Sequence, residues 1–215
     1  MIRRLIVLAA AAGSLAFGAL PAGAAPAHLS ERAVLAGGCF WGMEAVFESL
    51  RGVTGVVSGF SGGTALTAHY EVVSSGMTGH AESVEISYDP AQISYAQLLR
   101  VYFTVAHDPT ELNRQGPDDG TQYRSAIFYA NAEQKRIAER TIHELTAAKV
   151  FHDPIVTQVV ALTGFYPAEA YHQHFAERHP DYPYIVVNDK PKLVALRKQY
   201  APLLKPNAVA IELTQ

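Results

Sequence analysis

The stretch AVLAGGCFWGMEAVFESLRGVTGVVSGF, residues 33–60, contains the signals of a strand, a helix and a second strand. The apolar run Ala33–Ala36 ends at two glycines, which predicts a buried strand followed by a turn. Apolar residues then recur at helical spacing over Phe40–Leu50, and Gly52 predicts the end of that helix. The β-branched stretch Val53–Phe60 predicts a strand, and its two glycines predict a bulge or a close backbone approach.

A second strand–helix–strand unit follows in the sequence. Residues Ser83–Tyr88 alternate between polar and apolar side chains, which is typical of a half-buried strand. Ser94 can cap a helix whose apolar side chains lie between Leu98 and Phe103, and Tyr123–Tyr129 predicts the next strand. Two such units in succession are typical of the split βαβ or ferredoxin-like arrangement. We therefore expect an α+β fold in which two helices cover one face of an antiparallel or mixed sheet.

The remaining residues extend this core. A helix is expected from about Ala132 to Ala148, a strand near Ile155–Leu162 and a further helix from about Pro167 to Arg178. The proline-containing segment Pro180–Gln215 is expected to be long and irregular. Because no linker divides the chain, residues 25–215 are expected to form a single domain.

The first 24 residues have the pattern of a secretory signal. A basic start at Arg3 and Arg4 precedes an alanine-rich apolar run that ends at Leu20, and small residues suit cleavage after Ala24. The alternative is a membrane anchor, but an apolar run of about 16 residues is shorter than the span of about 20 that a bilayer requires. The pattern predicts cleavage and a location in the periplasm or outside the cell, with no stable membrane association afterwards.

The charge and cysteine content exclude several classes of protein. The chain has 17 basic and 20 acidic residues and a net charge of -3, too little positive charge for a protein that binds nucleic-acid phosphates. Its single cysteine excludes an intramolecular disulfide framework and any site with several cysteine ligands.

That cysteine, Cys39, lies where the first predicted strand gives way to the first turn of a helix. Free N–H groups at a helix N-terminus favour the nucleophilic thiolate, so we expect a reactive thiol; the alternative is a buried, inert cysteine. On a helical wheel Trp41 lies roughly opposite the apolar stripe that includes Phe40 and Phe47. Trp41 could thus form an apolar wall beside the thiol, or it could pack against a neighbouring loop.

The sequence around this cysteine resembles the A-type peptide methionine sulfoxide reductases. The similar blocks are Gly38–Gly42, Gly59–Gly63, Tyr70–Val73, Thr78–Glu82, His107–Thr110, Gln115–Asp118, Gly120–Ser125 and Tyr184–Lys192. Together they extend over about residues 34–198, which is nearly all of the chain after the predicted signal.

The resemblance implies an oxidoreductase that reduces methionine S-sulfoxide, free or in oxidised proteins, to methionine. It implies that Cys39 is the nucleophile and that Glu82 donates a proton to the leaving oxygen, a role that fits a carboxyl group in an apolar pocket. It further implies that Tyr70 and Tyr123 hold the sulfoxide oxygen and that Asp118 orders a hydroxyl or a water. Phe40 and Trp41 are similar to the pair that cradles the substrate's methyl group.

The sequence departs from the family pattern at three places. Phe60-Ser61 stands where Tyr-Ala is more usual, Ala68-His69 stands where Asn-Pro is common, and Ser74 stands where many members have a second cysteine. A sulfenic acid formed on Cys39 would therefore find no resolving thiol in the same chain. We expect an external reductant, either a thioredoxin-like or glutaredoxin-like protein or a small thiol. No bound cofactor and no metal are expected, and the protein is expected to be a monomer.

Two other functions remain open from the sequence. A cysteine hydrolase would pair Cys39 with a histidine, for which the candidates include His80, His107 and His172. An exported metal-binding module would use the histidine-rich stretch that contains His172, His174 and His179, of which the first and last could share a helix face.

Overall fold

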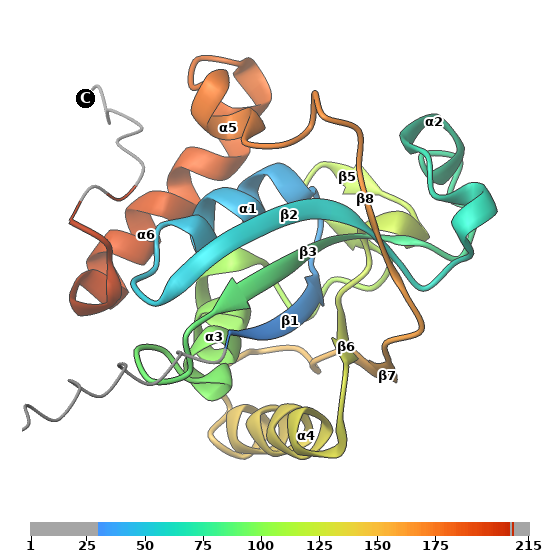
Figure 1. The fold of residues 1–215 in the computed structure, drawn as a ribbon. Coiled ribbons are helices and arrows are strands. Elements are labelled where there is room, and N and C mark those ends of the chain that lie inside the picture. Colours follow the sequence, from blue (N-terminus) through green and yellow to red (C-terminus); the bar gives the residue numbers. More distant parts are fainter. Residues whose placement is uncertain (1–29, 207, 209–215) are drawn as a thin grey trace, which may run out of the picture.

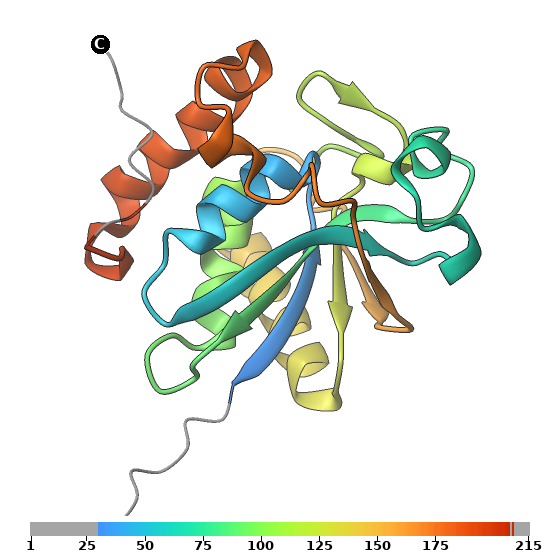
Figure 2. The ribbon, with the colours of Figure 1, turned by 45° about the horizontal axis from the view of Figure 1, so that its top comes forward.

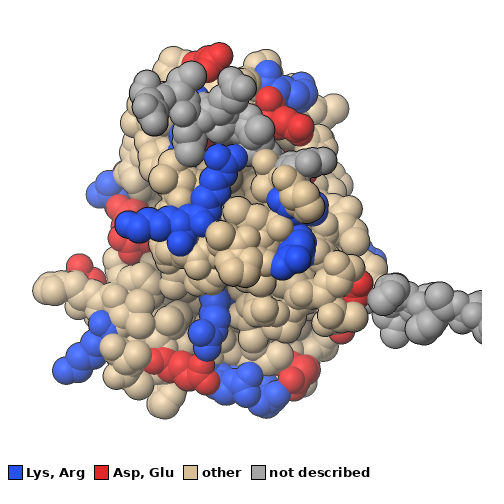
Figure 3. Space-filling model, turned by 90° about the vertical axis from the view of Figure 1, so that its left-hand side faces the viewer, with Lys and Arg blue, Asp and Glu red and all other residues tan. Residues whose placement is uncertain are grey.

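The computed structural model describes residues 30–206 and 208. The predicted signal, residues 1–24, lies outside the described residues. Within the described part of the chain, no helix is long and apolar enough to cross a membrane. On the face shown in Figure 3, basic side chains are separated by uncharged surface, and acidic side chains lie among them.

A six-stranded sheet forms the centre of the fold, with the strand order β7-β6-β1-β3-β2-β8 (Figures 1 and 2). The strands are β1 (Glu31–Ala36), β2 (Val53–Ser61), β3 (Ala81–Tyr88), β6 (Ala126–Tyr129), β7 (Gln158–Ala161) and β8 (Phe165–Pro167). Strands β1 and β2 both run antiparallel to β3, which lies between them, and β6 runs antiparallel to β1. This is the split βαβ arrangement, so the expected α+β, ferredoxin-like core is confirmed.

The principal helices pack on one face of this sheet. They are α1 (Phe40–Glu48), α3 (Tyr95–Val101), α4 (Ala132–Ala147) and α6 (Lys190–Tyr200). One apolar core joins the helix residues Phe47, Leu98 and Leu193 to Leu35 of β1. The neighbouring β1 residue Val34 belongs to a separate small cluster, because successive side chains of a strand point to opposite faces.

Two local features follow the sequence pattern closely. Ser94 caps α3 through a capping box with Gln97, as the serine in front of the apolar run predicts. The register of β2 against β3 shifts between Val53 and Gly55, which is the predicted bulge. At Gly59 an added Cβ would collide with the backbone of Tyr166 in β8, so this glycine permits the predicted close approach.

Several predicted boundaries are wrong. The predicted helix at Pro167–Arg178 is reduced to the short α5 (Phe175–Arg178). The C-terminal segment is largely helical, because a π-helical turn at Ile185–Asp189 leads directly into α6. Pro191 is the second residue of α6 and lies just after the π-helical turn.

Two predicted strands are shorter than expected. Strand β6 starts at Ala126, since a 3₁₀ turn occupies Thr121–Tyr123, and the strand predicted near Ile155–Leu162 is β7. The connections between core strands contain short elements: a 3₁₀ turn (Ala65–Thr67), α2 (Tyr70–Val73), and the small hairpin of β4 (Arg114–Gln115) and β5 (Asp118–Asp119). A last 3₁₀ turn, Ala201–Leu203, follows α6.

Candidate active site

A cavity of about 210 Å³ opens at the N-terminus of α1. The residues that line it are Cys39, Phe40, Trp41, Tyr70, Glu82, Asp118, Tyr123, Tyr182 and Tyr184. The structure thus brings together all seven residues that the sequence proposed for the site. A larger hollow of about 650 Å³, lined by residues such as Leu145 and Ile155, shares no residue with this cavity.

The backbone between β1 and α1 holds Cys39 at the cavity. Cys39 is the N-cap of α1, and Gly38 has a φ of +89°, a conformation that glycine adopts without strain. A side chain at position 38 would also overlap that of Gln115, in β4. The turn that aims the thiol therefore requires glycine, and Cys39 is left only 8% exposed.

Glu82 lies beside Cys39 because its carboxylate caps the same helix. The second residue of β3, Glu82 accepts a hydrogen bond from the backbone N–H of Phe40 at 3.1 Å, which satisfies one of the free donors at the start of α1. Burial is the main cause that raises the pKa of Glu82 to about 8; the Phe40 N–H opposes this shift, and Asp118 adds to it. At neutral pH the carboxyl group is therefore mostly protonated, the form that can donate a proton.

The charge state of Cys39 differs from the expectation. The sequence predicted a thiolate favoured by the helix N-terminus, but burial, followed by the charges of Glu82 and Asp189, raises the pKa of this thiol. The backbone N–H of Trp41 and the charge of Lys192 act in the opposite direction with smaller effect. Without substrate the thiol is protonated, because desolvation outweighs the helix terminus.

Two tyrosines face the same cavity from the connections between core strands. Tyr70 belongs to α2, whose first N–H is held by the carboxylate of Glu169, and Tyr123 belongs to the 3₁₀ turn before β6. Burial and then the charge of Glu82 raise the pKa of Tyr70 to about 12 and that of Tyr123 as well. Both hydroxyl groups therefore stay protonated and can donate hydrogen bonds to an oxygen in the cavity.

An aromatic wall forms the other side of the cavity. Trp41 stacks on Phe175 of α5 with ring centroids 3.8 Å apart, and its Nε1–H donates to Nδ1 of His172. Both sequence interpretations of Trp41 thus hold, since it lines the cavity and also packs on a later segment. Phe40 is buried against Phe60, as the helical wheel indicated, and it reaches the cavity as well.

Asp118 is held at the cavity by a residue that the sequence had not singled out. The Tyr184 hydroxyl donates a hydrogen bond to its carboxylate, whereas the adjacent Asp119 is exposed and does not line the cavity. Burial raises the pKa of Asp118, and the Tyr184 hydrogen bond and then Lys192 oppose that shift.

Tyr182 and Tyr184 were missed because the C-terminal segment was expected to be irregular. Tyr182 meets the Trp41 ring edge-on at 6.1 Å between centroids, and Tyr184 does so at 5.9 Å. The block Tyr184–Lys192 resembles the family, and this similarity was the sequence signal that could have placed Tyr184 at the site.

The histidines of the hydrolase alternative are engaged elsewhere. His80 bonds to the backbone of Gly63 and Thr64, and His107 bonds to the Tyr102 carbonyl and the Ser125 hydroxyl. His172 receives the Trp41 indole N–H. Among the described residues no hydrogen bond joins a histidine to Cys39, so the nucleophile–base pair of a cysteine hydrolase is not formed.

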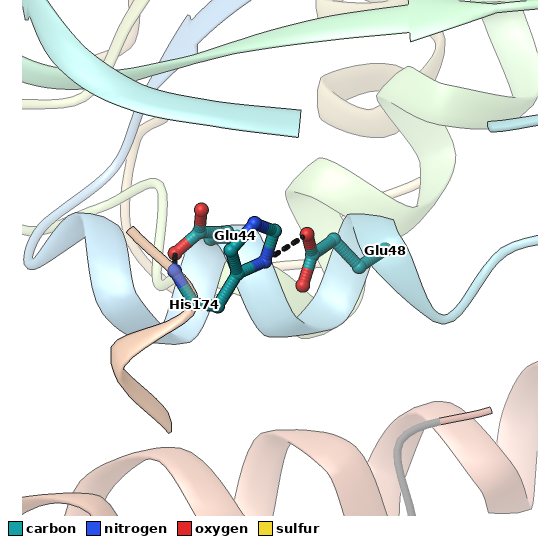
Figure 4. A group of neighbouring side chains, drawn as sticks. All are labelled: Glu44, Glu48 and His174. Atoms are coloured by element: carbon teal, nitrogen blue, oxygen red, sulfur yellow. Dashed lines mark hydrogen bonds and ion pairs between the residues drawn. The ribbon is translucent and has the colours of Figure 1, made fainter. Parts of the chain in front are cut away.

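The histidine-rich stretch also differs from the expected metal site. His172 and His179 share no helix face, because α5 begins only at Phe175. In the described part of the chain, His174 alone of the three joins a donor group that could hold an ion, with Glu44 and Glu48 (Figure 4). These groups already bond to each other: the His174 backbone N–H donates to Glu44, and its Nδ1 lies 2.8 Å from Glu48. We interpret this cluster as the attachment of α5 to α1.

Comparisons with known proteins agree with the site. Residues 31–203 match the family model described as "Peptide methionine sulfoxide reductase". A "Peptide methionine sulfoxide reductase MsrA 2" from Synechocystis sp. is 55% identical over 176 residues, which cover 82% of each chain. The protein of the same name from Mesorhizobium japonicum is 53% identical over 85% of this chain and 93% of its own.

Solved structures show the same fold. Methionine sulfoxide reductase A of Corynebacterium diphtheriae aligns with a TM-score of 0.60 at 36% identity, over 70% of this chain and 76% of that one. Reduced Mxr1 from Saccharomyces cerevisiae aligns with a TM-score of 0.65 at 30% identity, over 71% of this chain and 87% of its own.

Proposed function

The chain belongs to the peptide methionine sulfoxide reductase family, and we propose that it acts through a sulfenic acid on Cys39 that an external thiol reduces. It is a peptide-methionine (S)-S-oxide reductase, an oxidoreductase that converts methionine sulfoxide to methionine and so repairs oxidised proteins. The observation that carries the proposal is the meeting of Cys39 with the buried, mostly protonated Glu82 in one cavity.

The proposed reaction transfers one oxygen atom. The Cys39 thiol first gives its proton to water, and the resulting thiolate attacks the sulfur of the sulfoxide while Glu82 protonates the oxygen. The S–O bond of the substrate breaks, and the hydroxyl group passes to the cysteine sulfur. The products are methionine, the sulfenic acid of Cys39 and the carboxylate of Glu82, which regains its proton from water. Sulfur is reduced in the substrate and oxidised in the enzyme, so the electrons balance.

The cavity has a place for each part of the substrate. The methyl group would lie against the aromatic wall of Phe40 and Trp41, and the oxygen would point to the hydroxyls of Tyr70 and Tyr123 beside Glu82. Negative charge builds up on the oxygen as the S–O bond breaks, and hydrogen-bond donors that are already in place stabilise that charge. Asp118 would order a hydroxyl group or a water at the same end.

An external thiol would close the catalytic cycle. Two thiols reduce the sulfenic acid to the Cys39 thiol and water, and they leave as a disulfide. Ser74 ends α2 and is exposed, and the chain has no second cysteine that could take this role. A thioredoxin-like or glutaredoxin-like protein, or a small thiol, would supply the electrons to a monomeric enzyme.

The decisive experiment compares the two sulfoxide epimers. Wild-type enzyme should reduce the S epimer and leave the R epimer, and Cys39→Ser should be inactive on both. In a single turnover without thiol, one methionine should form per enzyme, and a dimedone adduct should appear on Cys39. Retained activity in Cys39→Ser, or equal reduction of both epimers, would contradict the proposal.

The proposed site of action is an exported compartment, and the N-terminal signal pattern supports it. Expression of the full chain in a Gram-negative host should yield a periplasmic protein whose mass corresponds to cleavage after Ala24. A cytoplasmic protein that retains Met1 would contradict this part of the proposal.

A further inference from the structure

A buried ion pair lies behind the first turn of α1, outside the cavity lining. Asp189 ends the π-helical turn and is fully buried, and its Oδ1 lies 3.1 Å from Nζ of Lys192, whose side chain is 17% exposed. The second carboxylate oxygen, Oδ2, is buried without a hydrogen-bond partner. Removing such charges from water costs several kcal/mol per ion, so the pair needs a reason beyond stability.

Gly42 shows how closely this pair approaches the helix that carries Cys39. A Cβ at position 42 would overlap Asp189 Oδ1 and would lie 3.0 Å from Lys192 Nζ. Gly42 comes three residues after Cys39, so the two lie on neighbouring positions of one helix side. A glycine inside a helix costs about 1 kcal/mol relative to alanine, and here it makes room for two charges.

The two charges act on Cys39 in opposite directions. Asp189 raises the pKa of the thiol and Lys192 lowers it, and Asp189 has the larger effect. The other ionisable groups that line the cavity of the thiol come from several elements: Glu82 of β3, Asp118 of β5, Tyr70 of α2, Tyr123 of the 3₁₀ turn, and Tyr182 and Tyr184 before the π-helical turn. Lys192 is the cation whose charge lowers the pKa of the thiol.

We propose that the Asp189–Lys192 pair is a positioning element that, in addition to burial, tunes the charge state of Cys39 before substrate binds. Burial raises the pKa of Asp189, and Lys192 opposes that shift and so favours the carboxylate. In this form Asp189 favours the protonated thiol, and Lys192 limits the effect so that the thiolate stays accessible. A protonated thiol reacts slowly with small electrophiles and oxidants. The pair therefore protects a cysteine that has no second thiol in its chain. This inference rests on the proposed role of Cys39 as the nucleophile.

The test measures the thiol directly and needs no turnover. Alkylation of Cys39 by iodoacetamide is followed by mass spectrometry between pH 6 and pH 10, in the wild type, Asp189→Asn and the double variant Asp189→Asn/Lys192→Met. At pH 7, Asp189→Asn should react about tenfold faster than the wild type, because a negative charge near the thiolate is lost. The double variant should lie between them, because it loses the cation as well.

Matched controls come from a second ion pair of the same segment, whose acidic partner is exposed. Lys190 lies 3.8 Å from Asp181, which is 96% exposed, so Asp181→Asn and Lys190→Met should leave the alkylation rate unchanged. If the Asp189–Lys192 pair had a purely structural role, its variants would melt at lower temperature, but their alkylation rates would not follow the predicted order. The inference is overturned if Asp189→Asn reacts no faster than the wild type, or if the double variant matches Asp189→Asn.

The double variant decides the question even where Asp189→Asn does not fold, since it leaves neither charge buried alone. It should then react faster than the wild type, and an equal rate would overturn the inference. A wild-type enzyme without reductase activity would contradict the proposed function. It would leave the alkylation result unaffected, because alkylation reports on the thiol alone.

Discussion

The ferredoxin-like core and the segment after β7 contribute different parts of the cavity. The core supplies the two groups that would exchange oxygen and proton, Cys39 at the start of α1 and Glu82 in β3. The later segment supplies Phe175, which backs the aromatic wall, and Tyr184, which holds Asp118. Reacting groups thus lie on rigid elements, where geometry is most precise, and their surroundings come from a separate part of the chain. Substitutions in the core should lower kcat, whereas those in the segment should change binding and ionisation.

Glu82→Gln should give the largest effect short of removing the thiol. Glutamine keeps the acceptor oxygen for the Phe40 N–H but has no proton to donate, so kcat should fall by about 10²- to 10³-fold. Since the pKa of Glu82 is about 8, wild-type activity should also fall above that pH, and the variant should lose this decline. Steady-state rates between pH 6 and pH 10 measure both.

Glu85→Gln is the matched control for this prediction. Glu85 lies in the same strand, but its carboxylate pairs with the exposed Arg32 at 3.4 Å. Its kcat should stay within about twofold of the wild type, as expected for a surface ion pair. Similar losses in the two variants would mean that Glu82 acts only through the stability of β3.

Tyr184→Phe tests the contribution of the C-terminal segment to the polar end of the cavity. It removes the hydroxyl that donates to Asp118, which leaves a half-buried carboxylate without this hydrogen bond. We expect kcat/KM to fall about tenfold, with Tyr171→Phe as the control on an exposed tyrosine of the same segment. Equal effects of the two substitutions would contradict a specific role for Tyr184.

Phe175→Ala should have a smaller effect, mainly on KM. Trp41 loses the ring on which it stacks, so the wall for the methyl group becomes less ordered while Cys39 and Glu82 stay in place. KM should rise about fivefold with kcat within twofold, and Trp41 fluorescence should shift. Phe151→Ala, at the unrelated hollow beside α4, is the control. A fall in kcat that exceeds the rise in KM would contradict the proposed division between core and segment.

The same division describes what the sequence could predict. Alternating and helical patterns determined the core, because residues such as Leu35 and Phe47 are buried by neighbours from the same two units. The patterns failed for the segment, where Leu193 and Leu196 of α6 are buried against a core formed much earlier in the chain. The prolines of this segment obscured its helix signals.

For the site, motif similarity located the lining residues but could not give their ionisation. The N-terminus of α1 predicts a thiolate at Cys39, while the carboxylates that oppose it come from β3 and from the π-helical turn. Glu82 and Asp189 are distant from Cys39 in the sequence, and no local pattern reports on their charges. Desolvation likewise depends on the whole fold, so its effect on the thiol became visible only in the structure.

Glu44→Gln tests the contact between α1 of the core and α5 of the later segment, and it should have the smallest effect. Glu44 of α1 accepts the backbone N–H of His174 at 2.8 Å; burial, and then Glu48, raise its pKa from 4.5 to about 8. A carboxyl group whose folded pKa is raised contributes stability that is complete below about pH 4.5 and is lost as the pH rises through 8. Glutamine keeps the acceptor oxygen and cannot ionise.

At pH 5 the melting temperatures of the Glu44→Gln variant and the wild type should therefore agree. At pH 8.5 the variant should be more stable by about 1 kcal/mol, or roughly 2–4 °C for a domain of this size. Glu139→Gln, at an exposed position of α4, should show no such difference. If the wild type and Glu44→Gln melt alike at both pH values, Glu44 is ionised at no cost, and the attachment of α5 to α1 does not depend on its proton.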